Sequence, residues 1–199
     1  VGAAVVRRVL ETATQGSFFT ATATTEIYTL APHDALPISV LVVLGAAAEE
    51  AAALLVDDPR IRTVYADSWA DGMGASLRVG LQDLLAVPAH GDNNTPGLAE
   101  VAVVSLVDLP DVGAAVVRRV LETATQGSPD ATAVLARAAY GGAPGHPVVL
   151  GRDHWRAVAE GAHGDAGARG YLSTHDVTLV ECGDLAGGQD RDTPDPTAG

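Results

Sequence analysis

The stretch EVAVVSLVDLPD, residues 100–111, decides the fold class of this chain. Every residue from 101 to 107 is apolar except Ser105, and the run leads directly into Asp108. A short apolar run rich in β-branched residues is typical of a strand buried on both faces of a parallel sheet. Ligands of open α/β sheets bind just beyond the carboxyl ends of such strands, so Asp108 is the first candidate functional residue. The alternative is that residues 108–111 form only a turn that caps the next helix.

Length, composition and charge limit what the chain can be. Its 199 residues, 47% of them hydrophobic, predict one well-buried domain. The formal net charge of −13 argues against a nucleic-acid partner or an anionic membrane surface. A single cysteine, Cys182, excludes an internal disulfide and favours a reducing, cytoplasmic location. The longest apolar region, residues 40–56, is interrupted by Glu49 and Glu50 and is too short to cross a bilayer.

The first 39 residues do not fit the rest of the chain. Residues 1–17, VGAAVVRRVLETATQGS, recur letter for letter at 112–128, whereas repeat architectures contain three or more divergent copies. Residues 18–39 resemble the peptide string obtained when sequencing-adapter DNA is read as coding sequence. We therefore interpret residues 1–39 as a non-native segment. The alternative is a natural helix followed by a strand over TEIYTL, which has strand propensity.

From Val40 onward the sequence alternates between strands and helices. Apolar runs predict strands, and helical periodicity or propensity predicts helices. The expected strands are 40–45, 61–66, 101–107, 132–140, 148–150 and 176–182; the expected helices are 46–56, 76–85, 112–125 and 153–160, with another opening within 164–172. A glycine-rich turn between two of these strands predicts a hairpin, so the sheet of this α/β chain should be mixed.

A glycine-rich loop precedes the helix expected at 76–85. Gly72 and Gly74 make the loop flexible, and Ser76 places a hydroxyl group at the helix N-terminus. Backbone donors and a hydroxyl at such a position can hold a base or a phosphate. The alternative is a plain cap and turn.

Carboxylates near the expected sheet edge suggest a magnesium site. Magnesium takes few protein carboxylates and leaves its other positions to water and phosphate oxygens. Asp190 and Asp192 in the tail could converge with Asp108, which would suit phosphoryl or nucleotidyl transfer. The alternative is that the tail carboxylates are merely solvated.

Five motifs follow one another along the chain: SWADGMGASLRVGL (68–81), VDLP (107–110), YGGAPGHPVVL (140–150), GDAGAR (164–169) and DRDTP (190–194). In this order they resemble the MobA-like nucleotidyltransferases, especially the molybdenum cofactor cytidylyltransferase branch. The resemblance covers essentially all of residues 40–199. It implies a three-layer αβα, Rossmann-like fold with a mixed sheet, and a reaction that joins the NMP part of CTP, or of another NTP, to a phosphorylated cofactor such as molybdopterin with release of pyrophosphate.

The resemblance also implies roles for individual residues. Asp108 would be a catalytic magnesium ligand, with Asp190 or Asp192 supplying the second carboxylate. The implied nucleotide-binding residues are Gly74, Ala75 and Ser76, and the implied acceptor-binding residues are Gly145, His146, Pro147, Asp165 and Arg169.

The departure from the family lies at the front of the chain. Members resemble one another most in a first strand followed by a loop of the type LAAGxSxRMGxxK, and residues 1–39 contain nothing that matches it. That strand would be central, so its loss leaves ladder groups unpaired. TEIYTL could fill the vacant position by strand propensity, but it brings no phosphate loop. We expect an active magnesium-dependent parent and an unstable, inactive chain in this form; the alternative is a non-catalytic relative that binds the cofactor.

Overall fold

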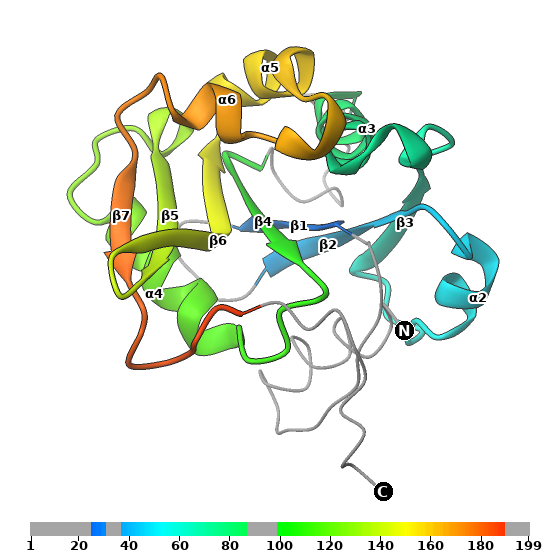
Figure 1. The fold of residues 1–199 in the computed structure, drawn as a ribbon, viewed down its shortest axis with the longest axis horizontal. Helices are drawn as coiled ribbons and strands as arrows, with labels where there is room; N and C mark the ends of the chain where they lie inside the picture. Colours follow the sequence, from blue (N-terminus) through cyan, green and yellow to red (C-terminus); the bar gives the residue numbers. More distant parts are fainter. Residues whose placement is uncertain (1–24, 31–36, 87–98, 190–199) are drawn as a thin grey trace, which may run out of the picture.

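The computed structural model describes residues 25–30, 37–86 and 99–189. In these ranges the chain forms three layers, with a seven-stranded mixed sheet between two layers of helices (Figure 1). The strand order is β3-β2-β1-β4-β6-β5-β7. The expected α/β fold with a three-layer arrangement is therefore confirmed.

The strands are β1 (Thr25–Leu30), β2 (Pro37–Leu44), β3 (Ile61–Tyr65), β4 (Val101–Leu106), β5 (Leu135–Tyr140), β6 (Ala143–Gly151) and β7 (Thr178–Glu181). The α-helices are α2 (Ala48–Ala53), α3 (Met73–Ala86), α4 (Ala114–Thr125), α5 (Arg152–Gly161) and α6 (Arg169–Leu172), with 3-10 turns η1 (Trp69–Asp71), η2 (Ala131–Ala133) and η3 (Gly164–Ala166).

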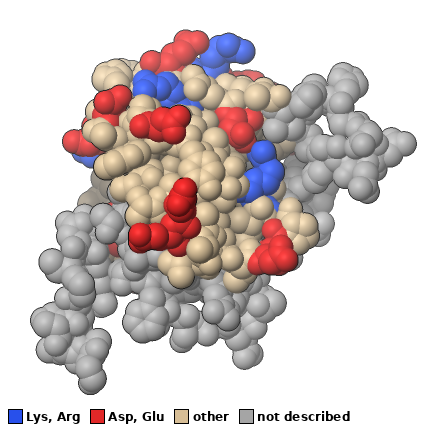
Figure 2. Space-filling model, turned by 90° about the vertical axis from the view of Figure 1, so that its right-hand side faces the viewer, with Lys and Arg blue, Asp and Glu red and all other residues tan. Residues whose placement is uncertain are grey.

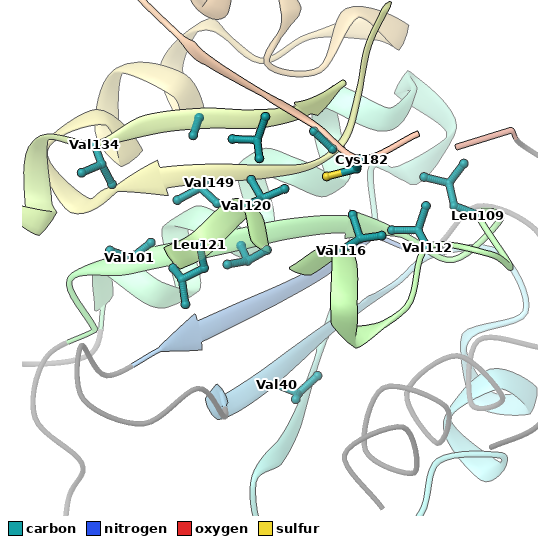
Figure 3. Packing of buried hydrophobic residues seen from close by; sticks show 14 of the residues in the cluster. Val40, Val101, Leu109, Val112, Val116, Val120, Leu121, Val134, Val149 and Cys182 are labelled. Atoms are coloured by element: carbon teal, nitrogen blue, oxygen red, sulfur yellow. The ribbon is translucent and has the colours of Figure 1, made fainter. Parts of the chain in front are cut away.

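Strand β4 has a hydrophobic cluster on each face. Alternate residues of a strand point to opposite faces of the sheet. On one face, Val101 and Val103 belong to a hydrophobic cluster that includes buried residues of helix α4 and is drawn in Figure 3. Ala102 and Val104 pack on the other side with residues of α3 and α5. Burial on both faces confirms the expectation from the apolar run. The expectation of parallel neighbours is wrong, because β4 pairs antiparallel with both β1 and β6; an apolar run reports burial, not the direction of the adjacent strands.

TEIYTL forms β1 and fills the position between β2 and β4, as the strand propensity of this segment predicts. It runs antiparallel to both neighbours: Thr25 pairs with Val43 and Leu106 near the carboxyl ends of β2 and β4. Leu30, the last residue of β1, lies beside Val101, the first residue of β4. The carboxyl end of β1 therefore lies at the edge of the sheet where β4 begins, and not at the edge where Asp108 lies.

Helix α3 begins earlier than the sequence predicts. The first helical residue is Met73, so Ser76 lies inside the first turn and does not cap the helix. Gly72 has a φ of 103°, a conformation that favours glycine, and this residue separates η1 from the helix. The apolar face is as expected, with Leu77, Leu81 and Leu84 buried.

The described surface fits the acidic composition. On the face shown in Figure 2, acidic side chains are scattered over a largely uncharged surface, and basic side chains form no continuous stripe. No helix within the described ranges is long and apolar enough to span a membrane.

Candidate active site

A cavity of about 360 Å³ lies beside the carboxyl end of β4. Its walls come from β4, β5, β6, the start of α3 and the segment that includes η3 and α6. The charged and imidazole side chains that line it are Asp108, Arg137, His146 and Arg169. A concave site of this size with a few convergent polar groups is the usual form of a small-molecule site.

Asp108 lies where the sequence predicts it, two residues beyond the end of β4, and its half-buried side chain lines the cavity. Asp108 provides the single carboxylate among the described residues that line the cavity. The described ranges contain no cluster of three or more His, Cys, Asp or Glu residues that could bind a metal ion. Asp190 and Asp192 lie outside the described residues. A single carboxylate suits Mg²⁺, which is commonly held by one or two carboxylates together with substrate phosphates.

The GHP motif lies on β6. Gly145 and His146 line the cavity, whereas Pro147 is buried behind them and follows a cis peptide bond. The hydroxyl group of Tyr140 donates a hydrogen bond to the carbonyl oxygen of His146 over 2.7 Å. A Cβ at Gly145 would lie 2.7 Å from the Tyr140 ring, so the close approach of strand and ring requires glycine. The motif thus builds one wall of the cavity.

Arg137 is the lining residue that the sequence reasoning missed. Its Nε donates a hydrogen bond to the carbonyl oxygen of Gly145 over 3.1 Å. Burial lowers the pKa of the Arg137 guanidinium, and the nearby positive charge of Arg169 lowers it further. Within the described part of the chain, no carboxylate forms an ion pair with Arg137 or Arg169. The available signal was a lone charge between alanines in the apolar strand LARAAY.

The pKa of His146 is lowered to about 4, first by burial and then by the positive charges of Arg137 and Arg169. The imidazole is therefore neutral at pH 7 and can exchange hydrogen bonds without adding charge. The cavity thus combines two cationic side chains, one neutral imidazole and the carboxylate of Asp108.

Other predicted site residues lie close to the cavity but do not line it. Asp165 is exposed, and its carbonyl oxygen accepts a hydrogen bond from Nη2 of Arg169 over 3.1 Å. Gly74 and Ala75 are buried in the first turn of α3, and Ser76 is half-buried beside them. A Cβ at Gly74 would lie 2.6 Å from the backbone nitrogen of His163, so this glycine permits close packing. Contact of these three helix residues with a nucleotide stays a prediction.

Comparison with known proteins identifies the family. A family model described as "MobA-like NTP transferase domain" matches residues 3–179. The chain belongs to the MobA-like NTP transferase family. Nicotine blue oxidoreductase from Paenarthrobacter nicotinovorans is 34% identical over 164 residues, which cover 77% of this chain and 71% of that protein.

Two solved structures share the fold of this MobA-like chain. A homologue of Mycobacterium tuberculosis rv0371c from mycobacterium sp. strain JC1 has a TM-score of 0.54 and 26% identity, with 77% of this chain and 68% of that chain covered. The manganese complex of Rv0371C from Mycobacterium tuberculosis H37Rv has a TM-score of 0.50 and 22% identity, with 71% and 67% covered, and supports the fold alone. Family membership supports a nucleotidyltransferase with a nucleotide substrate and a small-molecule acceptor.

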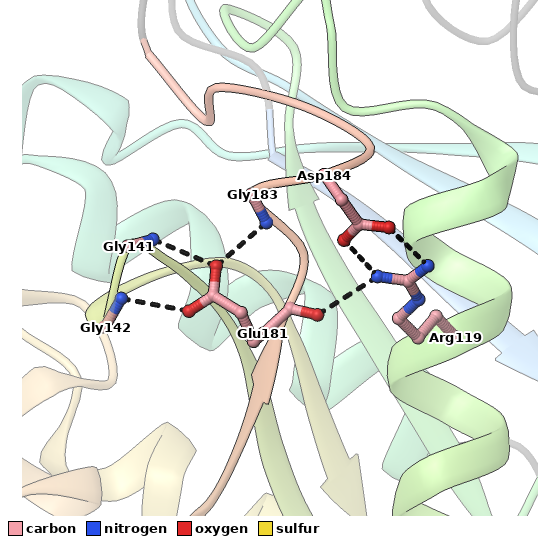
Figure 4. Close-up of polar contacts among 6 residues, drawn as sticks. All are labelled: Arg119, Gly141, Gly142, Glu181, Gly183 and Asp184. Atoms are coloured by element: carbon pink, nitrogen blue, oxygen red, sulfur yellow. Dashed lines mark hydrogen bonds and ion pairs between the residues drawn. The ribbon is translucent and has the colours of Figure 1, made fainter.

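In this MobA-like chain the C-terminal segment, residues 181–189, returns from β7 to the cavity. The carboxylate of Glu181 accepts hydrogen bonds from the backbone N–H groups of Gly141, Gly142 and Gly183, each over 2.9 Å (Figure 4). Farther along, Asp184 pairs with Arg119 of α4. Gly188 then lines the cavity. The segment is therefore fastened to the β5–β6 turn and to α4 before it reaches the site.

Proposed function

We propose that the natural parent of this chain is a Mg²⁺-dependent nucleotidyltransferase that joins CMP from CTP, or another NMP, to the phosphate of a molybdopterin-type cofactor and releases pyrophosphate. The observation that carries this proposal is that one cavity contains both Asp108, at the end of β4, and the cationic pair Arg137 and Arg169. Arg137 is half-buried and Arg169 is exposed, and the guanidinium groups of both can form charge-assisted hydrogen bonds with an anion in the cavity. We place the reaction in the cytoplasm because Cys182, the single cysteine, is free and buried.

The acceptor side is the better defined part of the proposed mechanism. Arg137 and Arg169 hold the anionic group of the acceptor, and neutral His146 can exchange a hydrogen bond with it without changing the charge of the site. Asp165 supports Arg169 through its carbonyl oxygen, while Gly145 and Pro147 shape the wall. These contacts orient the acceptor phosphate for in-line attack on the α-phosphate, and no covalent enzyme intermediate is required.

The nucleotide side of the proposal rests on fewer described contacts. Asp108, together with Asp190 or Asp192, would hold Mg²⁺, and the ion would neutralise charge on the triphosphate. Gly74, Ala75 and Ser76, in the first turn of α3, face the nucleotide in this proposal. The triphosphate loop itself has to come from a front end other than residues 1–39, which in this proposal are non-native.

The antiparallel direction of β1 favours a second candidate, a non-catalytic relative that binds the acceptor alone. The carboxyl end of β1 lies away from the cavity, so β1 cannot deliver a phosphate loop there. Such a protein would bind cofactor without turning over any nucleotide. Because one relative is a nicotine blue oxidoreductase, oxidoreductase activity on nicotine blue is a further activity to assay in parallel.

The deciding experiment replaces residues 1–39 with a strand and a loop of the type LAAGxSxRMGxxK. Pyrophosphate release from each NTP is then measured with Mg²⁺ and molybdopterin. We expect no turnover by the present chain, metal-dependent turnover by the restored chain, and a loss of roughly 100-fold or more in restored Asp108→Asn. Asp130→Asn, an exposed carboxylate in the turn before β5, is the matched control. If the restored chain binds molybdopterin but releases no pyrophosphate from any NTP, the second candidate replaces the first.

A further inference from the structure

Asp111 lies three residues after Asp108, outside the cavity, and fastens the far end of the C-terminal segment. Its Oδ2 accepts hydrogen bonds from the backbone N–H groups of Gly187 over 2.6 Å and Gly188 over 3.2 Å. Successive backbone N–H groups that converge on one oxygen form an anion-binding nest, which here holds a carboxylate of the protein itself. Within the described part of the chain, these are the hydrogen bonds that anchor the two glycines.

Gly188 connects this anchor to the cavity wall. Its φ of 63° favours glycine, and a Cβ there would lie 2.2 Å from the ring of Tyr140. The same ring packs closely against Gly145, and its hydroxyl group donates to the carbonyl oxygen of His146. Gly188, Gly145 and His146 all line the cavity. Asp111 is thus linked through Gly188 and Tyr140 to the acceptor wall.

The start of the C-terminal segment is held elsewhere. Glu181 binds the β5–β6 turn, and Asp184 pairs with Arg119, as Figure 4 shows. Loss of Asp111 would leave both of these anchors in place and release only the end of the segment that reaches the cavity. The effect of Asp111 on the site can therefore be separated from the attachment of the segment as a whole.

We propose that Asp111 is a positioning residue that closes the acceptor cavity: it holds Gly187 and Gly188 so that Gly188 stays packed on Tyr140 and water is excluded from the wall that carries His146. The assignment rests on the proposed function only in treating this cavity as the acceptor site. Asp111 touches neither the acceptor nor a metal ion in this scheme. It acts through the backbone of the C-terminal segment.

The test uses the full 199-residue chain and needs no nucleotide, metal or acceptor. The pKa of His146 is measured by ¹⁵N NMR, with its signal assigned by His146→Gln. Because burial is the first cause of its low value of about 4, we expect Asp111→Ala to raise this pKa toward the ordinary 6.5 by about 1 unit or more. Gly188→Ala should act in the same direction, because its Cβ would collide with Tyr140. Asp111→Asn keeps an acceptor oxygen and should restore most of the wild-type value.

Amide exchange at Gly187 and Gly188 and the midpoint of urea unfolding are measured for each variant. Asp57→Ala, which removes an exposed carboxylate between α2 and β3, is the control. Faster exchange together with a raised His146 pKa at an unchanged unfolding midpoint supports the assignment. Faster exchange with an unchanged His146 pKa overturns it, because the segment would then be released without opening the cavity. Unchanged exchange in Asp111→Ala overturns it as well. Failure of nucleotidyl transfer in the restored chain would leave this result untouched, so the two proposals fail separately.

Discussion

The two sides of the central strand β4 differ in what they contribute. On one side, β6 and β5 supply part of the cavity wall, and the carboxylate of Glu181 on β7 accepts hydrogen bonds from the backbone N–H groups of the turn between them. On the other side, β1, β2 and β3 complete the sheet, and no residue of β2 or β3 whose side chain is described lines the cavity. Helix α2, which covers part of that side, buries no residue (Figure 1). In this MobA-like chain, the strands that complete the sheet and the strands that supply cavity-lining residues are therefore different.

Strand β1 shows why completing the sheet differs from supplying the site. Strand propensity and two apolar neighbours are sufficient to fill a position in a sheet. A phosphate loop requires in addition that the strand run toward the edge where the site lies. β1 meets the first condition and not the second, because it runs antiparallel to β2 and β4.

The largest expected contrast in stability compares Trp155, on the cavity side, with Leu54, on the opposite side. Trp155 is fully buried, and its indole N–H donates to the carbonyl oxygen of Leu150, whereas Leu54 is 52% exposed. We expect Trp155→Ala to lower the free energy of unfolding by about 3–5 kcal/mol and Leu54→Ala by less than about 0.5 kcal/mol. Urea unfolding measures both. Equal losses would mean that the two sides of β4 contribute alike to stability.

A smaller effect tests whether β1 belongs to the sheet. Ile27 pairs with Leu41 of β2 and with Val104 of β4, and proline at this position removes a backbone donor inside the sheet. We expect Ile27→Pro to cost roughly 2 kcal/mol or more, because ladder groups are left unsatisfied. Ile27→Val keeps the backbone donor and serves as the control. If Ile27→Pro changes neither the unfolding midpoint nor amide exchange in β2 and β4, then β1 does not complete the sheet.

The smallest effect concerns acid stability on the cavity side. The N–H groups of Gly142, Gly141 and Gly183 lower the pKa of Glu181 below its ordinary 4.5. A carboxyl group with a lowered folded-state pKa contributes stability above its unfolded-state pKa, and this contribution is lost as the pH falls through the folded-state value. The difference in urea midpoint between wild type and Glu181→Gln should therefore be largest near pH 7 and shrink below about pH 4.5. Glu160→Gln, on α5, is the control, and a difference that does not change with pH would contradict this account.

Local pattern was sufficient for much of the fold. Apolar runs located β4, β2, β3, β5 and β7, and the position of Asp108 at a strand end followed from them. Strand β6 is longer than expected, because it begins at Ala143 inside the stretch expected to be a glycine-rich turn. The apolar run did not predict the direction of the strands beside β4, because a strand that is buried on both faces can have antiparallel neighbours. Helix α3 began three residues before Ser76, because the positive φ of Gly72 ended the preceding turn.

The site was less predictable, because it depends on contacts between distant residues. Arg137 lines the cavity only because the β5–β6 hairpin places Gly145 beside it. Gly188 reaches the cavity through a hydrogen bond to Asp111, which is 77 residues away in sequence. Spacing along the chain carries no signal of such contacts. Asp165, which the resemblance places on the acceptor side, accepts a hydrogen bond from Arg169 through its backbone carbonyl oxygen, a contact that its spacing in the sequence does not predict.

The antiparallel β1 also has a consequence for how the chain folds. β1 and β2 are consecutive strands, separated only by residues 31–36, so they can pair as a local hairpin. A parallel first strand would need a crossover connection of about a dozen residues or more before it could pair. Local pairings close small loops and form early, whereas the pairing of Leu30 with Val101 must close a much longer one. We therefore expect β1 to pair with β2 before it pairs with β4.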